Sequence, residues 1–203
     1  MRWSTLAVLM GSVLIATADA RAQRVDIEAI KQGAQEAASE FAELRALLRS
    51  PDENLRLAAF DAMVDHGHPS LFELATATAL GDASDVIRAR ALWEVLSQRA
   101  TFTVLFDPEG SVADENIASE LDELFHGREN YEVAATFAAS KCLSLYQTSR
   151  CQAAYSLSLS GVVASLTYGD LVGQLVLDGD GVLRGTLRHD DVSGAFPAEI
   201  RLR

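Results

Sequence analysis

The sequence has few aromatic residues and lacks the motifs of the familiar enzyme classes. Aromatic side chains make up 7% of the chain, so an aromatic-rich cleft for sugars is not evident. There is no Gly-x-Ser-x-Gly elbow, no His-Glu-x-x-His pair and no glycine-rich phosphate loop. No stretch after residue 22 approaches the roughly 20 apolar residues that a membrane-spanning helix needs. These absences argue against catalysis and against a membrane-spanning protein.

Basic residues are also scarce, because 17 Lys and Arg stand against 29 Asp and Glu, for a net charge of −12. Nucleic acids and anionic lipid surfaces are therefore poor partners. Most of the acidic excess lies before residue 153. A solvated acidic face accounts for it, and a docking face for a basic partner is the alternative.

Residues 1–22 have the pattern of a secretory signal peptide. Arg2 precedes an apolar run over residues 6–16, and small residues follow, so cleavage after Ala20 or after Ala22 satisfies the small-x-small rule. An uncleaved anchor is the alternative, although the run is short for a bilayer. No Asn-x-Ser/Thr acceptor is present, which favours bacterial export. We expect a periplasmic or secreted protein.

The two cysteines, Cys142 and Cys151, are expected to form one disulfide outside the cytoplasm. They lie where a helical pattern ends and a strand pattern begins, so the bond would fasten that junction. A redox pair is the alternative, but the spacing is not Cys-x-x-Cys.

Residues 55–96 contain the same helical pattern twice, 32 residues apart. Superimposing the copies pairs Phe60 with Leu92, and Ala59 with Ala91. A repeat of this length is typical of stacked helical hairpins. The apolar spacing predicts four helices, and a third pair comes after them less regularly. In order, the expected helices cover residues 25–49, 52–66, 69–80, 84–99, 113–125 and 131–145.

From residue 153 the apolar period changes to two, which predicts strands. Residues 171–177 and 182–188 flank Asp178-Gly179-Asp180-Gly181, a strong hairpin signal. Residues 101–106 are β-branched and aromatic, so they form a short strand or an extended link. Pro197, in the last strand, suits an edge position.

Asp52-Glu53-Asn54-Leu55-Arg56 and Ser84-Asp85-Val86-Ile87-Arg88, each followed by an alanine-rich apolar helix, resemble HEAT repeats. The short period is most similar to the subclass that includes phycobilin lyase-like repeats. The resemblance implies that Arg56 and Arg88 have a structural role, bonding between neighbouring repeats. It covers about residues 51–98, and no lyase activity is carried over.

Three groups of polar residues could carry chemistry. Asp65-His66-Gly67-His68 could bind a metal, but Gly67 and Pro69 indicate an ordinary turn between helices. Asp178 and Asp180 resemble the start of a calcium loop, although position twelve is His189 instead of glutamate. The acidic residues from Asp114 to Glu123 could supply paired carboxylates, and they also suit a helix start.

The sequence thus predicts an α+β protein, an α-solenoid of about three helical hairpins followed by a small antiparallel β-sheet domain. The expected domains are the signal peptide (1–22), the helical repeats (23–150) and the β domain (151–203). We expect an extracytoplasmic scaffold or adaptor, without catalysis, cofactor or metal, that binds another protein with a basic surface. A small periplasmic enzyme or enzyme inhibitor that uses the β domain is the alternative. The candidate contact residues are Asp61, Asp65, Arg90 and Glu94.

Overall fold

The computed structural model describes residues 27–202, so the expected signal peptide lies outside the described residues. The chain divides into two compact units, one ending at Ser39 and one beginning at Glu40. The described part of the first unit is residues 27–39 of helix α1 (Ile27–Leu48). Within the described residues, no helix is both long and apolar enough to cross a membrane.

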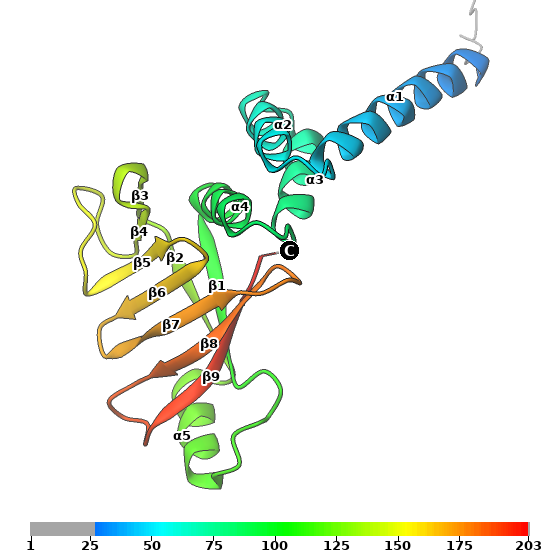
Figure 1. Ribbon diagram of the computed structural model, residues 1–203. Coiled ribbons are helices and arrows are strands. Elements are labelled where there is room, and N and C mark those ends of the chain that lie inside the picture. Colours follow the sequence, from blue (N-terminus) through cyan, green and yellow to red (C-terminus); the bar gives the residue numbers. More distant parts are fainter. Residues whose placement is uncertain (1–26, 203) are drawn as a thin grey trace, which may run out of the picture. The chain divides into compact units, whose positions relative to one another are not determined.

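Three short helices come after α1 in the second unit, and their ends agree with the expected ones to within a few residues (Figure 1). The Asp52 side chain accepts hydrogen bonds from the amides of Asn54 and Leu55, which begins the first of them. Gly67, with a φ of 74°, makes the turn to the next. The three are α2 (Glu53–Asp65), α3 (Pro69–Ala79) and α4 (Asp85–Ser97).

Phe60 of α2 and Leu92 of α4, which the repeat alignment pairs, are both fully buried. Ala59 and Ala91 are buried as well. The equivalence ends at the start of the helices, because Leu55 is 44% exposed and Ile87 is 1% exposed. The second copy is therefore enclosed more completely than the first.

The rest of the second unit is a curled, nine-stranded, fully antiparallel sheet with the strand order β2-β1-β9-β8-β7-β6-β5-β4-β3. Its inner face is packed with apolar side chains, among them Leu175, Leu187 and Phe196. The α+β fold class is thus confirmed. The strands are β1 (Thr101–Phe106), β2 (Arg128–Glu132), β3 (Ala135–Phe137), β4 (Cys142–Ser144), β5 (Tyr155–Ser160), β6 (Val163–Tyr168), β7 (Leu171–Leu177), β8 (Val182–Arg188) and β9 (Ala195–Arg201).

The two ends of this strand order, β2 and β3, belong to one stretch of chain. Only Val133 and Ala134 separate them. The Val133 amide donates to Ala100 O beside β1, and the Ala134 amide donates to Ser144 O of β4, each at 2.8 Å. The first part of this stretch, β2, pairs with β1, and the second part, β3, pairs with β4. The sheet is therefore curled so that its two edge strands lie end to end along the chain.

The prediction of a helix over residues 131–145 is wrong, and with it the third helical hairpin. The expected helix over 113–125 does form, as α5 (Glu115–Phe125), but the chain then continues as β2, β3, a short 3-10 turn η1 (Ala138–Ser140) and β4. Pairing with β1 and β5 decides the structure here, because strands this short have little preference of their own. Strands β1 to β4 therefore lie within residues 23–150, which the sequence pattern assigns to the helical domain.

Pro197 does not lie in an edge strand, since β9 runs between β8 and β1. The pairing of β9 with β1 covers only Glu199 and Ala198 and stops before Pro197. The missing amide hydrogen of proline is therefore not needed on that side.

The predicted disulfide between Cys142 and Cys151 is present. Cys142 lies in β4 and Cys151 in the loop that leads to β5. The bond thus fastens a loop between two strands, and not the junction of a helix with a strand.

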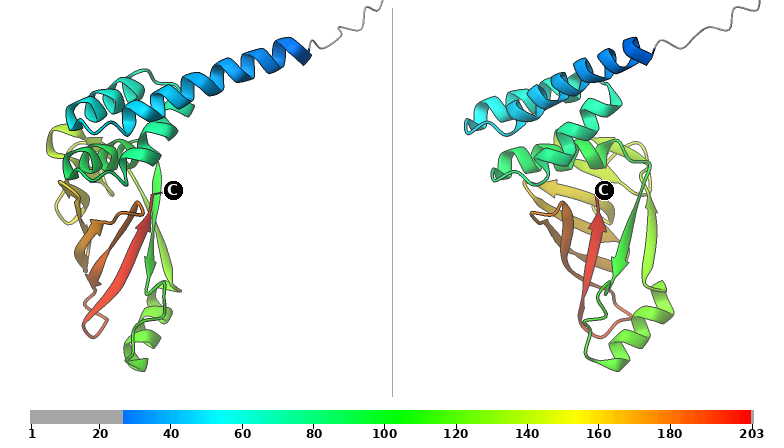
Figure 2. Two further views of the ribbon diagram at one scale, coloured as in Figure 1. Left: turned by 45° about the vertical axis from the view of Figure 1, so that its right-hand side comes forward. Right: turned by 90° about the vertical axis from the view of Figure 1, so that its right-hand side faces the viewer.

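Helices close both ends of the curled sheet (Figures 1 and 2). At one end lies α4, whose Arg88 donates to the Leu177 carbonyl of β7 at 2.7 Å. At the other lies α5, whose Phe125 ring stacks on Phe106 of β1 at 4.2 Å. Helical and sheet residues share one continuous apolar core.

Candidate functional site

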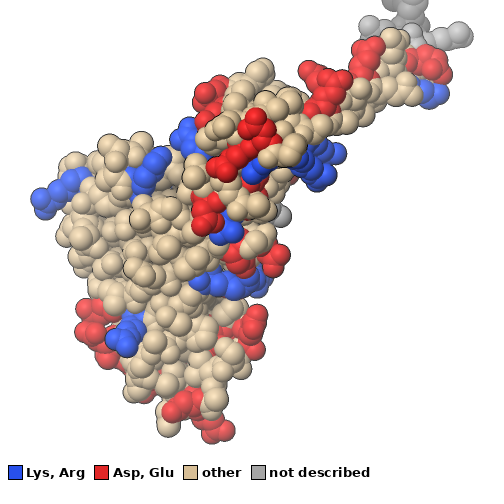
Figure 3. Space-filling model, viewed as in Figure 1, with Lys and Arg blue, Asp and Glu red and all other residues tan. Residues whose placement is uncertain are grey.

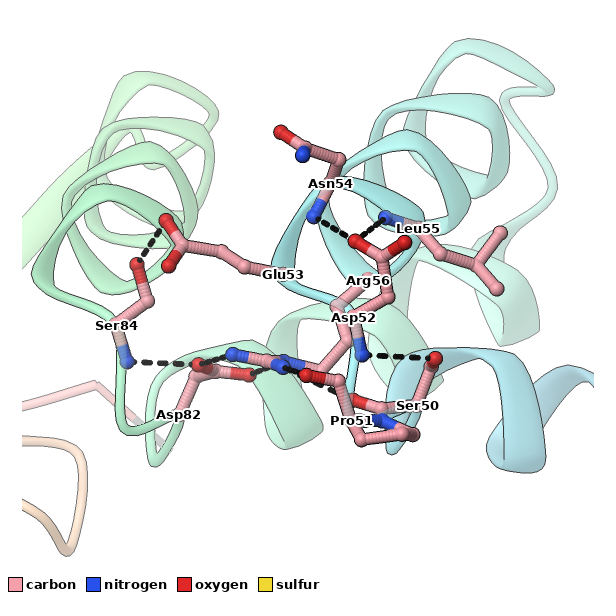
Figure 4. A network of polar contacts seen from close by, with 9 residues as sticks. All are labelled: Ser50, Pro51, Asp52, Glu53, Asn54, Leu55, Arg56, Asp82 and Ser84. Atoms are coloured by element: carbon pink, nitrogen blue, oxygen red, sulfur yellow. Dashed lines mark hydrogen bonds and ion pairs between the residues drawn. The ribbon is translucent and has the colours of Figure 1, made fainter.

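Arg56, which the resemblance to HEAT repeats implies to be structural, links two of the connections between helices (Figure 4). Its Nε and Nη2 donate to the two carboxylate oxygens of Asp82 at 2.8 and 2.9 Å. Its Nη1 donates to Ser50 O at 2.9 Å. Arg56 therefore joins the α1–α2 connection to the α3–α4 connection by a two-pronged ion pair.

Asp82 is held in its ionised form by this network. Burial by itself would raise the pKa of Asp82, but the hydrogen bonds from Arg56 and from the Ser84 amide outweigh burial and lower that pKa. A carboxyl group whose pKa is lower in the folded than in the unfolded protein stabilises the fold at pH values above the unfolded pKa, about 3.9. That stabilisation is lost as the pH falls through the folded pKa.

We expect Asp82→Asn to lower the free energy of unfolding by about 2 kcal/mol at pH 7, since the amide cannot replace a charged acceptor. The difference from the unchanged protein should shrink as the pH falls below about 4. Urea unfolding at pH 7, 5 and 3 measures both effects. The control is Asp85→Asn, because the Asp85 side chain is 74% exposed and 3.6 Å from Arg88. An equal difference at pH 3 and pH 7 would contradict the assignment.

Arg88, the counterpart of Arg56 in the second copy, bonds to the sheet and not to another helical connection. Besides its bond to Leu177, its Nη2 lies 3.6 Å from Asp85. The Arg88 Nε is buried and has no hydrogen-bond partner. The two arginines thus have different roles, because Arg56 joins helical connections and Arg88 attaches α4 to the sheet.

Three of the four residues expected to contact a partner form ion pairs with one another. Arg90 Nε donates to Asp61 at 3.0 Å, and Arg90 Nη1 lies 3.1 Å from Glu94. The hydrogen bond to Asp61 is the largest of the effects that raise the pKa of Arg90, and Asp65 adds to it. These residues therefore tie α2 to α4, while Asp61 and Arg90 remain partly exposed.

A cavity of about 280 Å³ lies beside this ion-pair network, between α2, α4 and the sheet. Trp93 of α4 forms part of its wall, and Lys141 Nζ stands 4.5 Å from the centre of the Trp93 ring. The lining residues are Leu57, Asp61, Val86, Ala89, Arg90, Trp93, Lys141, Leu159 and Gly161.

A larger and more apolar depression, which we call the helical groove, lies between α2, α3 and the part of α1 from Glu40 onward. Its volume is about 460 Å³. Apolar side chains from all three helices line it, and Leu47 is 41% exposed there. The lining residues are Glu40, Phe41, Leu44, Leu47, Ala59, Ala62, Met63, His66, His68 and Leu71.

Two of the polar residues named above as candidates for chemistry, His68 and Asp178, have structural partners. His68 Nδ1 accepts a hydrogen bond from the Ser70 amide and so begins α3. Asp178 accepts from the amides of Asp180 and Val182 within the hairpin turn and pairs with Arg184. Within residues 27–202, no three His, Cys, Asp or Glu side chains are grouped to hold a metal ion.

Two of the acidic residues around α5, Asp114 and Glu120, are likewise engaged in the fold. Asp114 accepts hydrogen bonds from the Asn116 and Ile117 amides and begins the helix. Glu120 accepts from the Ser193 amide, which fastens the β8–β9 loop to α5. The position of Asp114 at the start of α5 agrees with the interpretation that acidic residues here interact favourably with the helix dipole.

A group of tyrosines lies together, which no pattern in the sequence indicates. All four tyrosines of the chain, together with Phe102, form one row of ring contacts. Ring centres are 5.4 Å apart for Phe102 and Tyr131, 5.0 Å for Tyr131 and Tyr168, and 5.4 Å for Tyr168 and Tyr155. The rings of Tyr155 and Tyr146 are 5.2 Å apart. These residues are far apart in the sequence, so no local pattern indicates that their rings are in contact. The pairing of the strands brings them together.

No family model matches the chain, and comparison with curated proteins and with solved structures found no significant similarity.

Proposed function

We propose that this chain is an extracytoplasmic binding protein that holds an apolar segment of another protein in the helical groove. The observation that carries the proposal is the groove itself, with Phe41, Leu44 and Met63 facing an open space of about 460 Å³. Pockets of this size with mostly apolar walls are typical of binding sites. An amphipathic helix that lays its apolar face into such a groove is a common form of peptide recognition.

The charge of the chain favours a partner with basic residues beside its apolar segment. Glu40 borders the groove, and the net charge of the chain is −12. Such a field speeds the encounter with a basic partner and disfavours acidic ones. The HEAT-like pattern of residues 51–98 supports the same kind of function, since stacked helices act through the surfaces they offer. The expected signal peptide and the disulfide support a periplasmic or secreted location.

Site-specific photo-cross-linking in the native host tests this proposal. A benzophenone amino acid at Leu47, 41% exposed in the groove, should yield a discrete cross-linked protein. The matched control is the same group at Val176, 48% exposed on β7, which should not yield it. Adding Leu44→Glu should abolish the product while the circular dichroism of the protein stays unchanged. No product at Leu47, or the same product at both positions, would contradict the proposal.

A small periplasmic enzyme or enzyme inhibitor is the second candidate. The cavity beside Trp93 favours it, because Asp61, Arg90 and Lys141 converge there between helices and sheet. We rank it second since Arg90 is already paired with two carboxylates. If this candidate is correct, a small molecule will bind in that cavity and the cross-linker at Leu47 will capture no protein.

A further inference from the structure

A lysine and a tryptophan from distant parts of the chain meet at the cavity between α2, α4 and the sheet. Lys141 Nζ stands 4.5 Å from the centre of the Trp93 ring, and both side chains line the cavity. Trp93 is 6% exposed, so its ring forms a fixed wall. Val86, which also lines the cavity, is 59% exposed, so the cavity opens to solvent beside it. A small molecule thus has a way in and a rigid aromatic wall to lie against.

The backbone of Lys141 is held in an uncommon conformation at the edge of this cavity. Its φ is 49°, in the left-handed region that favours glycine. The Leu159 amide donates to Lys141 O at 2.8 Å, and the next residue, Cys142, is held by the disulfide. The sheet therefore fixes the point from which the lysine side chain starts. A binding group that is positioned before the ligand arrives has less entropy to lose.

The Lys141 ammonium group has no acidic partner. In the part of the chain that the structure describes, it forms no hydrogen bond and no ion pair, and residues 133–169 contain no Asp or Glu. Over β3, β4 and β5 the charged groups in view in Figure 3 are blue. The carboxylates nearest to the cavity are those of Asp61 and Glu94, and both pair with Arg90. Lys141 is thus a cation with three free donors at the cavity.

The size and the walls of the cavity narrow the class of ligand. Apolar side chains of α2, α4 and β5 line it, among them Leu57, Ala89 and Leu159. Its volume is about 280 Å³. A water molecule takes up about 30 Å³ in the liquid, so the volume equals that of about nine water molecules. The cavity therefore suits a ligand of about ten non-hydrogen atoms with an apolar body.

We propose that this cavity binds a small carboxylic acid with an apolar body, whose carboxylate accepts hydrogen bonds from Lys141 Nζ. Hydrogen bonds between an ammonium group and a carboxylate are stronger than those between neutral groups. The apolar body lies against Trp93 and Leu159. The ligand carries a single negative charge, because the carboxylates of Asp61 and Glu94 repel a second one. The residues described as lining this cavity and those lining the helical groove are different, so the two sites are separate.

Titration of the purified full chain with octanoate tests this proposal. Octanoate fits the cavity in size and carries a single negative charge, and octanamide has the same shape without the charge. The chain has two tryptophans, so in a Trp3→Phe background the fluorescence of Trp93 alone reports binding beside its ring. Octanoate should bind about tenfold more tightly than octanamide, since only the acid offers a charged acceptor to Lys141.

Three variants assign the binding to its residues. Lys141→Met should weaken octanoate binding about tenfold and leave octanamide binding unchanged, so the acid and the amide should bind this variant equally. Lys31→Met, at the other lysine of the chain, is the matched control and should change neither affinity. Ala89→Phe, which fills the cavity, should abolish the binding of both compounds. Circular dichroism of each variant checks that the fold is retained.

The proposal is overturned if octanoate leaves the Trp93 fluorescence unchanged, or if octanamide binds as tightly as octanoate. It is also overturned if the acid and the amide still differ in affinity for Lys141→Met. Tighter binding of a peptide that ends in leucine than of octanoate would overturn it as well, and would indicate the C-terminus of another protein as the ligand. None of these results bears on cross-linking at Leu47, so the proposal for the helical groove is tested separately.

Discussion

Replacing Gly185 with alanine is expected to destabilise the protein by about 3 kcal/mol or more, because β7 and β8 approach too closely to admit a side chain. A Cβ at Gly185 would lie 2.9 Å from Leu175 Cα and even closer to the Gln174 carbonyl oxygen. Both are backbone atoms of a paired strand, so neither can rotate away. Gly173 on β7 is confined in the same manner by the backbone of β8. Urea unfolding followed by circular dichroism measures the loss.

Gly179→Ala is the matched control for this prediction. Gly179 lies in the turn that joins the same two strands, and a Cβ there would meet no atom within 4 Å. Its substitution should change stability by less than about 1 kcal/mol, with a gain expected from the stiffer unfolded chain. If Gly185→Ala unfolds at the same urea concentration as the unchanged protein, that result will contradict the close approach of the β7 and β8 backbones.

Phe60→Ala and Leu92→Ala should each cost about 3 to 5 kcal/mol, the largest losses expected in the helical part. Both side chains are fully buried, so truncation leaves a cavity that the neighbouring helices cannot fill without moving. A marginally stable domain could lose most of its stability in this way. Thermal and urea unfolding of the two variants measure the loss.

The repeat supplies its own comparison for this second prediction. Leu55 and Ile87 are equivalent in the sequence alignment, but Leu55 is 44% exposed and Ile87 is 1% exposed. Leu55→Ala should therefore cost less than about 1 kcal/mol, whereas Ile87→Ala should cost about 2 to 5 kcal/mol. Equal losses at the two positions would show that the repeat alignment, and not the burial in the structure, describes the packing.

The helices α2, α3 and α4 could be predicted from the sequence almost to the residue because their signals are local. Asp52 begins α2 and Gly67 ends the turn after it, and both act within a few residues of their own position. The β7–β8 hairpin is local in the same sense, since Asp178 organises the turn through two neighbouring amides. Such elements need no information from the rest of the chain.

The structure of residues 131–145 could not be predicted, because it depends on distant partners. Val133, Phe137 and Cys142 have a spacing that a helix would accept, and the alanines around them favour one. The segment nonetheless pairs with β1 on one side and forms β4 beside β5 on the other. The row of ring contacts between the four tyrosines and Phe102 could not be predicted for the same reason.

The expected contact residues show how much helical periodicity can predict about the direction of a side chain. Asp61 and Arg90 were expected on one surface, and they do lie together, 3.0 Å apart. Periodicity could place them on corresponding faces of α2 and α4, but it could not tell whether they would face a partner or each other. The helical groove depends on the packing of three helices, so no single helix pattern could indicate it.

The stretch that carries both β2 and β3 has a consequence for the behaviour of the protein at high concentration. Strands with bare backbone amides and carbonyls are templates on which other chains assemble into aggregates. The two edge strands of this sheet are β2, with five residues, and β3, with three. Edge strands this short offer an incoming chain few backbone groups for hydrogen bonding, so we expect the protein to resist aggregation through its β-sheet.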